Sequence, residues 1–275
     1  MPLHDTHRVR RSGAGRPMVL VHGLGASFDC WREVEPLLRR HREVVVMDLP
    51  GFGAAEPLGG DVSIDAFADH LADLLEDEDL LDADLVGSSM GGEVVLELLR
   101  RGVGTGDVVA IAPSGYWGPW GLAWFRVVAW SATGLVTALR PVAHHVIGNP
   151  WGRRVLLRPL SPVPALLPEI TADATHTFGN THGFLPALRH LGGRRDPVRV
   201  PAGTAGPRRV SIVWGRRDGL CLPGQASAAL EAVPDATLHW LDGSGHLPPW
   251  DEPQATAELL LRVTGAVSAP DDSLA

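Results

Sequence analysis

The sequence predicts an α/β protein with a mostly parallel sheet flanked by helices and an inserted helical cap. Short β-branched runs alternate with segments whose apolar residues recur every three or four positions, which is typical of strand–helix–strand units. Several runs are apolar throughout, as expected for strands covered on both faces. After Pro113 the alternation stops for roughly ninety residues rich in Trp, Pro and Gly, and it resumes at Val210. We therefore expect a core domain at 1–113 and 206–275 and a helical cap at 114–205.

Each expected element follows from a local pattern. The N-terminal region is short, and one edge strand is expected around His7–Arg11. Apolar runs place buried strands at 17–22, 44–47, 85–86, 108–112, 210–214 and 236–241. Helices are expected through Trp31, Val34, Leu37 and Leu38, after Ser63 as N-cap, from after Gly92 to about Arg101, and from about Pro253 to Thr264.

Charge and composition exclude several function classes. The 275 residues include 24 basic and 32 acidic side chains, and the basic ones are all arginines scattered along the chain. A surface that tracks phosphates needs the opposite net sign, so no nucleic-acid partner is expected. Cys30 and Cys221 lie far apart and show no metal or redox spacing. We expect neither a metal nor an organic cofactor.

Two stretches bear on location. Residues 1–8 lack the apolar region of a secretory signal, so a cytoplasmic protein is expected. The stretch 121–139 is the most membrane-like, but it contains Arg126 and Gly134, and we expect no integral membrane segment. A cap that touches lipid is not favoured either, because no basic flank accompanies this stretch.

The strongest chemical signal is Gly87–Gly91, which joins an apolar run to a helical pattern. A sharp strand-to-helix turn strains the residue at its tip and crowds the residues two before and two after it. Ser89 has glycine at both places, whereas Ser88 has Val86 and Met90, so the frame selects Ser89 as a nucleophile. A glycine-rich loop that turns the chain or binds phosphate has the same short pattern, so other motifs must decide.

A serine nucleophile needs a base, and the base needs an acid that orients it. Of the twelve histidines, His246 follows the last expected strand in a glycine-containing loop that can reach back over the sheet edge. His22 ends an earlier strand, and its expected role is to brace the neighbouring glycine loop. Asp218 directly follows the penultimate strand and is the candidate acid; a turn paired with Arg216 or Arg217 is the alternative.

Two backbone amides are expected to form an oxyanion hole. The residue after the nucleophile, Met90, supplies one at a helix N-terminus, where the dipole favours negative charge. The turn His22-Gly23-Leu24-Gly25 is expected to supply the other, from the amide of Leu24.

Together these motifs resemble those of the α/β-hydrolase family with a cap domain. Serine, aspartate and histidine occur in the family's chain order, and a serine nucleophile disfavours the dehalogenase and epoxide hydrolase branches. The resemblance covers about 8–112 and 206–264 and implies two-step acyl transfer, in which Ser89 attacks, His246 moves the proton and Asp218 stays ionised. The matching segments are His22-Gly23-Leu24-Gly25, Asp48–Gly53, Gly87–Gly92, Asp218 and Gly245-His246.

The expected function is hydrolysis of a small to medium hydrophobic carboxylic ester or lactone, an esterase reaction. Carbon–carbon cleavage of a diketone-type acid uses the same triad and wants a carboxylate-binding arginine, for which Arg126 or Arg189 is a candidate. Thioesterase or acyltransferase chemistry and a non-catalytic binding protein remain alternatives, and the oligomeric state is open.

The cap contributes the candidate pocket residues. Trp117, Trp120 and Trp124 are spaced so that they can share one helix face. With Leu247, which follows the candidate base, they are expected to line an apolar substrate pocket. Ordinary packing of the cap on the core is the alternative.

Overall fold

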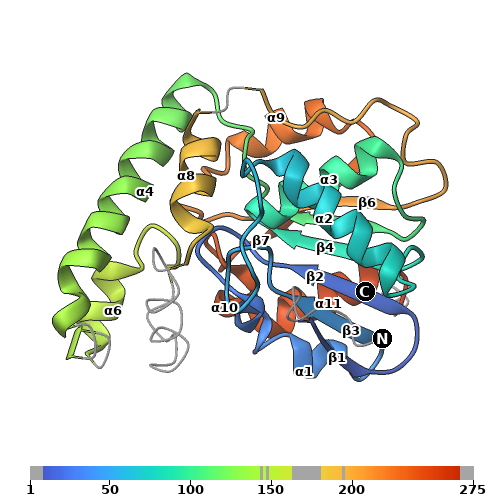
Figure 1. The fold of residues 1–275 in the computed structure, drawn as a ribbon, viewed down its shortest axis with the longest axis horizontal. Helices are drawn as coiled ribbons and strands as arrows, with labels where there is room; N and C mark the ends of the chain where they lie inside the picture. The colour runs from blue at the N-terminus through green and yellow to red at the C-terminus, as the bar shows by residue number, and fades with distance from the viewer. Residues whose placement is uncertain (1–8, 143–144, 147–148, 163–180, 194–195, 267–275) are drawn as a thin grey trace, which may run out of the picture.

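The computed structural model describes residues 9–142, 145–146, 149–162, 181–193 and 196–266 (Figure 1). Its centre is a seven-stranded sheet in the order β1-β3-β2-β4-β5-β6-β7. The edge strand β1 is antiparallel to β3, and all other neighbours are parallel, which confirms the mostly parallel sheet. The strands are β1 (Val9–Gly13), β2 (Pro17–Val21), β3 (Glu43–Met47), β4 (Asp84–Ser88), β5 (Val108–Ile111), β6 (Val210–Gly215) and β7 (Ala236–Leu241).

Helices cover both faces of the sheet, as the apolar strands require (Figure 1). Alternate side chains of β2 enter different cores: Val19 and Val21 pack with α2 and α3, whereas Met18 and Leu20 pack with α1 and α11. The core helices are η1 (Phe28–Trp31), α1 (Glu35–Leu38), α2 (Ile64–Asp77), α3 (Met90–Arg101), α9 (Gln225–Ala232), α10 (Pro248–Asp251) and α11 (Pro253–Val263).

The first predicted helix is divided in two. Residues 28–31 form a 3-10 turn and α1 begins only at Glu35, where Pro36 occupies the first turn, a position at which proline starts a helix readily. The N-cap predicted for α2 is confirmed, since the Ser63 hydroxyl accepts a hydrogen bond from the Ala66 amide at 3.1 Å.

Between β5 and β6 lies the inserted helical region. Its described helices are α4 (Pro119–Leu139), η2 (Arg140–Val142), α6 (Pro150–Leu156) and α8 (Phe184–Gly193). Figure 1 shows α4 and α6 on the side of the molecule away from the sheet, with α8 between α4 and the core. By length and composition alone, α4 is apolar enough to cross a membrane. The domain boundaries at 113/114 and 205/206 stay predictions.

A buried charge cluster anchors the amino end of the central strand β4. The Asp84 carboxylate, which is fully buried, lies 3.2 Å from Arg42 and 2.7 Å from Arg16. It also accepts a hydrogen bond from the Asp107 amide at 2.9 Å, and Arg42 donates to the Thr264 carbonyl at 2.6 Å. These contacts tie β4 to the start of β5 and to the end of α11.

We expect Arg42→Met to lower the free energy of unfolding by about 3 kcal/mol, because it leaves the buried Asp84 carboxylate with less compensating charge. Arg11→Met is the matched control. Arg11 pairs with Glu43 and Glu78 at the exposed edge, so its loss should cost less than about 1 kcal/mol. Urea unfolding of both variants makes the comparison, and equal effects would contradict it.

Candidate active site

The turn from β4 into α3 holds Ser89 in a strained conformation. Its backbone lies at φ 54° and ψ −115°, outside the regions that non-glycine residues normally occupy. A Cβ on Gly87 would lie 2.1 Å from the Gly91 carbonyl oxygen, and one on Gly91 would lie 2.4 Å from the Val21 oxygen. Only glycine fits at both places, so the backbone packs closely and presents Ser89 at the tip.

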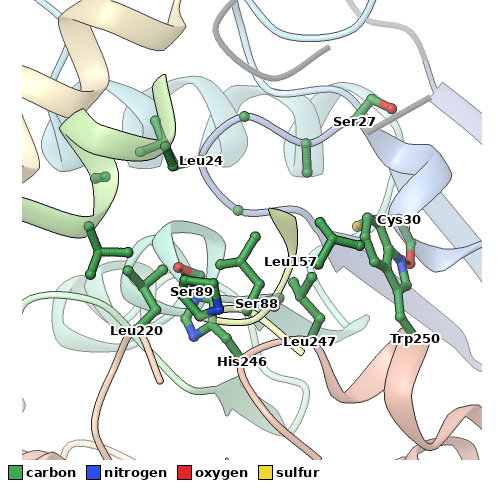
Figure 2. Close-up of a pocket in the computed structure, with 18 of the residues that line it drawn as sticks. Leu24, Ser27, Cys30, Ser88, Ser89, Leu157, Leu220, His246, Leu247 and Trp250 are labelled. Atoms are coloured by element: carbon green, nitrogen blue, oxygen red, sulfur yellow. Dashed lines mark hydrogen bonds between the residues drawn. The ribbon is translucent and has the colours of Figure 1, made fainter. Parts of the chain in front are cut away.

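Three side chains from separate loops meet at this tip, and Figure 2 shows two of them, Ser89 and His246. The Ser89 Oγ lies 3.0 Å from His246 Nε2, and His246 Nδ1 lies 2.8 Å from Asp218 Oδ2. The second Asp218 oxygen accepts hydrogen bonds from the amides of Leu220 and Cys221, both at 2.8 Å. The aspartate is therefore fixed by its own loop and cannot turn away from the histidine.

The hydrogen bonds among Ser89, His246 and Asp218 indicate which nitrogen of His246 carries the proton. Asp218 accepts the Nδ1 proton, which leaves Nε2 of His246 free to take a proton from Ser89. Burial, the largest single influence, lowers the pKa of His246, but the Asp218 carboxylate and Cys221 together more than offset it and hold the pKa of His246 well above its ordinary value. Burial also raises the pKa of the adjacent Cys221 thiol, so this cysteine is a neutral neighbour of the base.

His22 braces two loops and does not reach the nucleophile. It is fully buried, its Nδ1 donates to the Gly23 carbonyl at 2.8 Å, and its Nε2 accepts from the Leu49 amide at 2.9 Å. Burial lowers the pKa of His22, which keeps the ring neutral for this pair of bonds. The glycine turn beside the site is thereby held to the loop after β3.

The two predicted oxyanion donors occupy suitable positions. Met90 is the first residue of α3, where backbone amides have no partner within the helix. Leu24 lines the same cavity as Ser89, and a Cβ on Gly23 would lie 3.0 Å from the Ser89 Cβ, so the turn approaches the nucleophile closely. The assignment of these amides stays a prediction.

A largely apolar cavity of about 150 Å³ opens beside Ser89 and His246. Figure 2 shows Leu24, Leu220 and Leu247 near the serine, and Cys30 and Trp250 toward the other end. The inner face of α4 forms much of the wall, through Phe125, Val128, Ala129, Ala132 and Val136. Leu157, Pro159 and Leu160, after α6, complete it.

Residues 18–259 match the model of the alpha/beta hydrolase family. The chain belongs to this family. An uncharacterized protein of Mycobacterium tuberculosis strain H37Rv is 28% identical over 94% of this hydrolase and 79% of its own length. A 2-hydroxy-6-oxo-2,4-heptadienoate hydrolase of Pseudomonas putida is 42% identical over 103 residues, 36% of this chain and 35% of that protein.

Two solved structures have the same fold as this α/β hydrolase. A meta-cleavage product hydrolase from Pseudomonas fluorescens IP01 superposes with a TM-score of 0.71 at 20% identity, covering 94% of each chain. An enol-lactonase from Burkholderia xenovorans LB400 gives 0.73 at 19% identity, covering 94% of this chain and 95% of that one. At these identities the likeness concerns the fold alone.

The tryptophans predicted for the pocket do not line this cavity of the hydrolase. Trp117 precedes α4 and is buried in the core, stacked on Phe125 at 4.4 Å between ring centroids. Trp120 is 89% exposed, and Trp124 donates from its indole to the Gly219 carbonyl at 2.8 Å. Of the four predicted residues, Leu247 lies in the lining. Trp117 does not share a helix face with the other two because the helix begins only at Pro119, whereas Trp120 and Trp124 lie one turn apart on a side of α4 that does not line the cavity.

The sequence did not lead us to predict a buried acid beside Ser89. Glu93 lies in the first turn of α3, is fully buried, and accepts a hydrogen bond from the Ser114 hydroxyl at 2.6 Å. It links the nucleophile helix to the loop after β5, whose Ser114 amide also donates to the Ser89 carbonyl at 3.2 Å. A glutamate in the first turn of the helix, between two glycines and two valines, was the available signal.

A segment that joins the inserted helical region to the loop of His246 was not predicted either. The His246 amide donates to the Leu160 carbonyl at 2.7 Å. Next to it, Asp251 accepts hydrogen bonds from the Ser161 hydroxyl and from the Gly245 amide, the latter at 2.7 Å. No local pattern signals these contacts, because they join residues about ninety positions apart.

No metal site emerges in the part of the chain that the structure describes, where no three His, Cys, Asp or Glu side chains are grouped to hold an ion.

We expect kcat/KM to rise with pH through an apparent pKa above the ordinary histidine value, because His246 must be neutral to accept the Ser89 proton and its pKa is raised. Asp218→Asn removes the carboxylate, so the rise should move to lower pH while turnover falls by about 10⁴-fold. A pH profile of kcat/KM for both proteins is the measurement. An unchanged midpoint in the variant would contradict the role of Asp218.

Burial raises the pKa of Asp251 to about 6, even though the hydrogen bonds from Ser161 and Gly245 lower it. Because its folded pKa lies above the unfolded value near 4, the wild type should lose up to about 3 kcal/mol of stability as pH rises from 4 through 6. Asp251→Asn should abolish this part of the pH dependence. Chemical unfolding of both proteins at pH 4, 6 and 8 measures it, and parallel curves would refute it.

Proposed function

We propose that this α/β hydrolase is a serine esterase that cleaves small to medium hydrophobic carboxylic esters or lactones. The observation that carries the proposal is the chain Ser89–His246–Asp218, with contacts of 3.0 and 2.8 Å, in the wall of an apolar cavity.

The geometry supports two-step acyl transfer. His246 Nε2 takes the Ser89 proton as Oγ attacks the substrate carbonyl, and Asp218 stabilises the resulting imidazolium. The amides of Leu24 and Met90 are the proposed donors to the tetrahedral oxyanion. His246 then protonates the leaving group, and a water molecule repeats the sequence to release the acid. The first proton transfer, from Ser89 Oγ to His246 Nε2, joins atoms already in hydrogen-bond contact.

The cavity supports an uncharged, apolar substrate. Its volume of about 150 Å³ resembles that of a cavity able to hold a benzene-sized molecule, which suits a ring or a short chain. Beyond the catalytic pair its charged lining residues are Asp29 and Arg32, which lie 3.7 Å apart and are 33% and 41% exposed. Charge is thus confined to a solvated rim, away from the buried wall.

Carbon–carbon hydrolysis of a diketone-type acid is the second candidate, favoured by the 42% identity to the Pseudomonas putida hydrolase over 103 residues. Such a substrate carries a carboxylate. Neither arginine nominated for it lines the cavity: Arg126 donates to the Gly192 carbonyl, and Arg189 is exposed. Within the described lining, Arg32 is the remaining cation, and its pairing with Asp29 weakens its claim on a ligand.

The test is hydrolysis of chromogenic esters of graded acyl length by the wild type, Ser89→Ala and Ser88→Ala. Ser89→Ala should reduce turnover by at least about a thousandfold, because no other group replaces the nucleophile. Ser88→Ala is the matched control, since Ser88 lines the same cavity but ends β4, and it should retain most activity. Turnover should fall off once the acyl chain outgrows the cavity.

Labelling by a fluorophosphonate separates the remaining outcomes. Labelling of Ser89 without ester turnover would favour carbon–carbon cleavage, and Arg32→Gln should then raise KM for an acidic diketone. A protein that neither turns over esters nor reacts with the probe would overturn the proposal.

A further inference from the structure

The outer face of α4 is unusual for a helix packed on a core. Its inner face is buried through Leu122, Phe125, Ala129 and Val136. Its outer face leaves large apolar side chains in solvent: Trp120 is 89% exposed, Val127 60%, Trp130 45% and Leu135 44%. Exposed apolar surface on this scale marks an interaction site rather than ordinary packing.

The helix α6 repeats this character and adds charge. Trp151 and Val155 are 71% and 72% exposed, and Arg154 and Arg158 are exposed as well. Arg154 and Val155 follow Trp151 at i+3 and i+4, so these three residues share one side of α6, whereas Arg158 lies in the turn after the helix. Arg154 lies 5.7 Å from the Trp151 ring centroid. Tryptophan beside arginine on one surface suits an interface that is apolar on one side and anionic on the other.

The charge of this surface indicates which kind of partner binds to it. Residues 114–162 contain five arginines and no aspartate or glutamate, although the whole chain has 32 acidic residues and a net charge of −8. A second copy docked cap to cap would bring like charges together. An anionic lipid surface attracts such a cap and repels the acidic remainder, which orients the molecule.

The fold decides whether α4 spans a bilayer or lies on it. The helix is long enough to span one, but its inner face packs on the core and lines the catalytic cavity. Arg126 and Trp124 bind it to the carbonyls of Gly192 and Gly219 at 2.6 and 2.8 Å. With one face committed in this way, only the outer face is available to lipid.

We propose that the outer face of α4 and α6 is a membrane-docking surface, on which Trp120, Trp130 and Trp151 enter the headgroup region of an anionic phospholipid bilayer. Arg154 and Arg158 contact the lipid phosphates. The basic flank that 121–139 lacks in the sequence is supplied by Arg154 in α6 and Arg158 in the turn after it. This binding goes beyond the proposed esterase activity and does not depend on it, since Ser89 lies on the other side of α4, across the cavity.

Cosedimentation with vesicles tests the proposal. The wild type and Ser89→Ala should bind vesicles of phosphatidylcholine and phosphatidylglycerol in equal parts, at least about tenfold more tightly than pure phosphatidylcholine, and added salt should weaken this binding. Trp120→Gln/Val127→Gln should reduce binding at least about tenfold. These side chains are exposed, so the substitutions should leave folding intact. Leu81→Gln is the matched control, an apolar residue 40% exposed on the core, and should bind as the wild type does.

Two further variants test α6 and the charge. Trp151→Gln/Val155→Gln should weaken binding to the anionic vesicles, and Arg154→Gln/Arg158→Gln should also remove most of the salt dependence. Brominated lipid should quench the tryptophan fluorescence of the wild type, and substitution of the α4 and α6 tryptophans should abolish this quenching. Absence of wild-type binding, or equal binding by all variants, would overturn the proposal. So would a dimer in sedimentation velocity that the same tryptophan variants dissociate, since that result assigns the face to a second copy.

Discussion

The close backbone approach between β4 and α3 is the constraint on which the site depends. With no side chain at Gly87 or Gly91, the turn brings α3 against β4 and the end of β2, and Ser89 is held at a positive φ. Such a conformation costs on the order of 1–3 kcal/mol and persists only when its surroundings enforce it. At its other end β4 is anchored by the buried Asp84. The strand that leads into the strained turn is therefore fixed at both ends.

The inserted helical region and the loop of His246, the proposed base, share a support. The segment after α6 contributes Leu157, Pro159 and Leu160 to the cavity wall, and the Leu160 carbonyl accepts from the His246 amide. A substrate that displaced this segment would therefore also disturb the loop that carries the base. Substrate fit and base position are linked here by one stretch of backbone.

The helix α4 separates two environments. One face completes a dry cavity beside the nucleophile, and the opposite face exposes tryptophan and valine. Because both faces are apolar, its hydrophobic pattern is weakly one-sided, and sequence periodicity identifies a helix without telling which side faces the core. For this reason the aromatic residues at 120 and 124 were predicted from their spacing to line the pocket. In the structure they lie outside the cavity, which the aliphatic and aromatic side chains of the other face enclose.

Local sequence was sufficient for the strands, for the Ser63 cap and for the position of Ser89 at the tip of the turn. Each of these rests on contacts between near neighbours in the chain: β-branched runs, a hydroxyl three residues from an amide, and two glycines around a serine. It also nominated His246 and Asp218, which follow strands whose carboxyl ends must meet at one sheet edge. The division of the first helix, the role of Glu93, the Leu160 contact and the lining of the cavity were decided only by tertiary structure. They depend on which faces of distant segments meet, and hydrophobicity alone does not encode that choice.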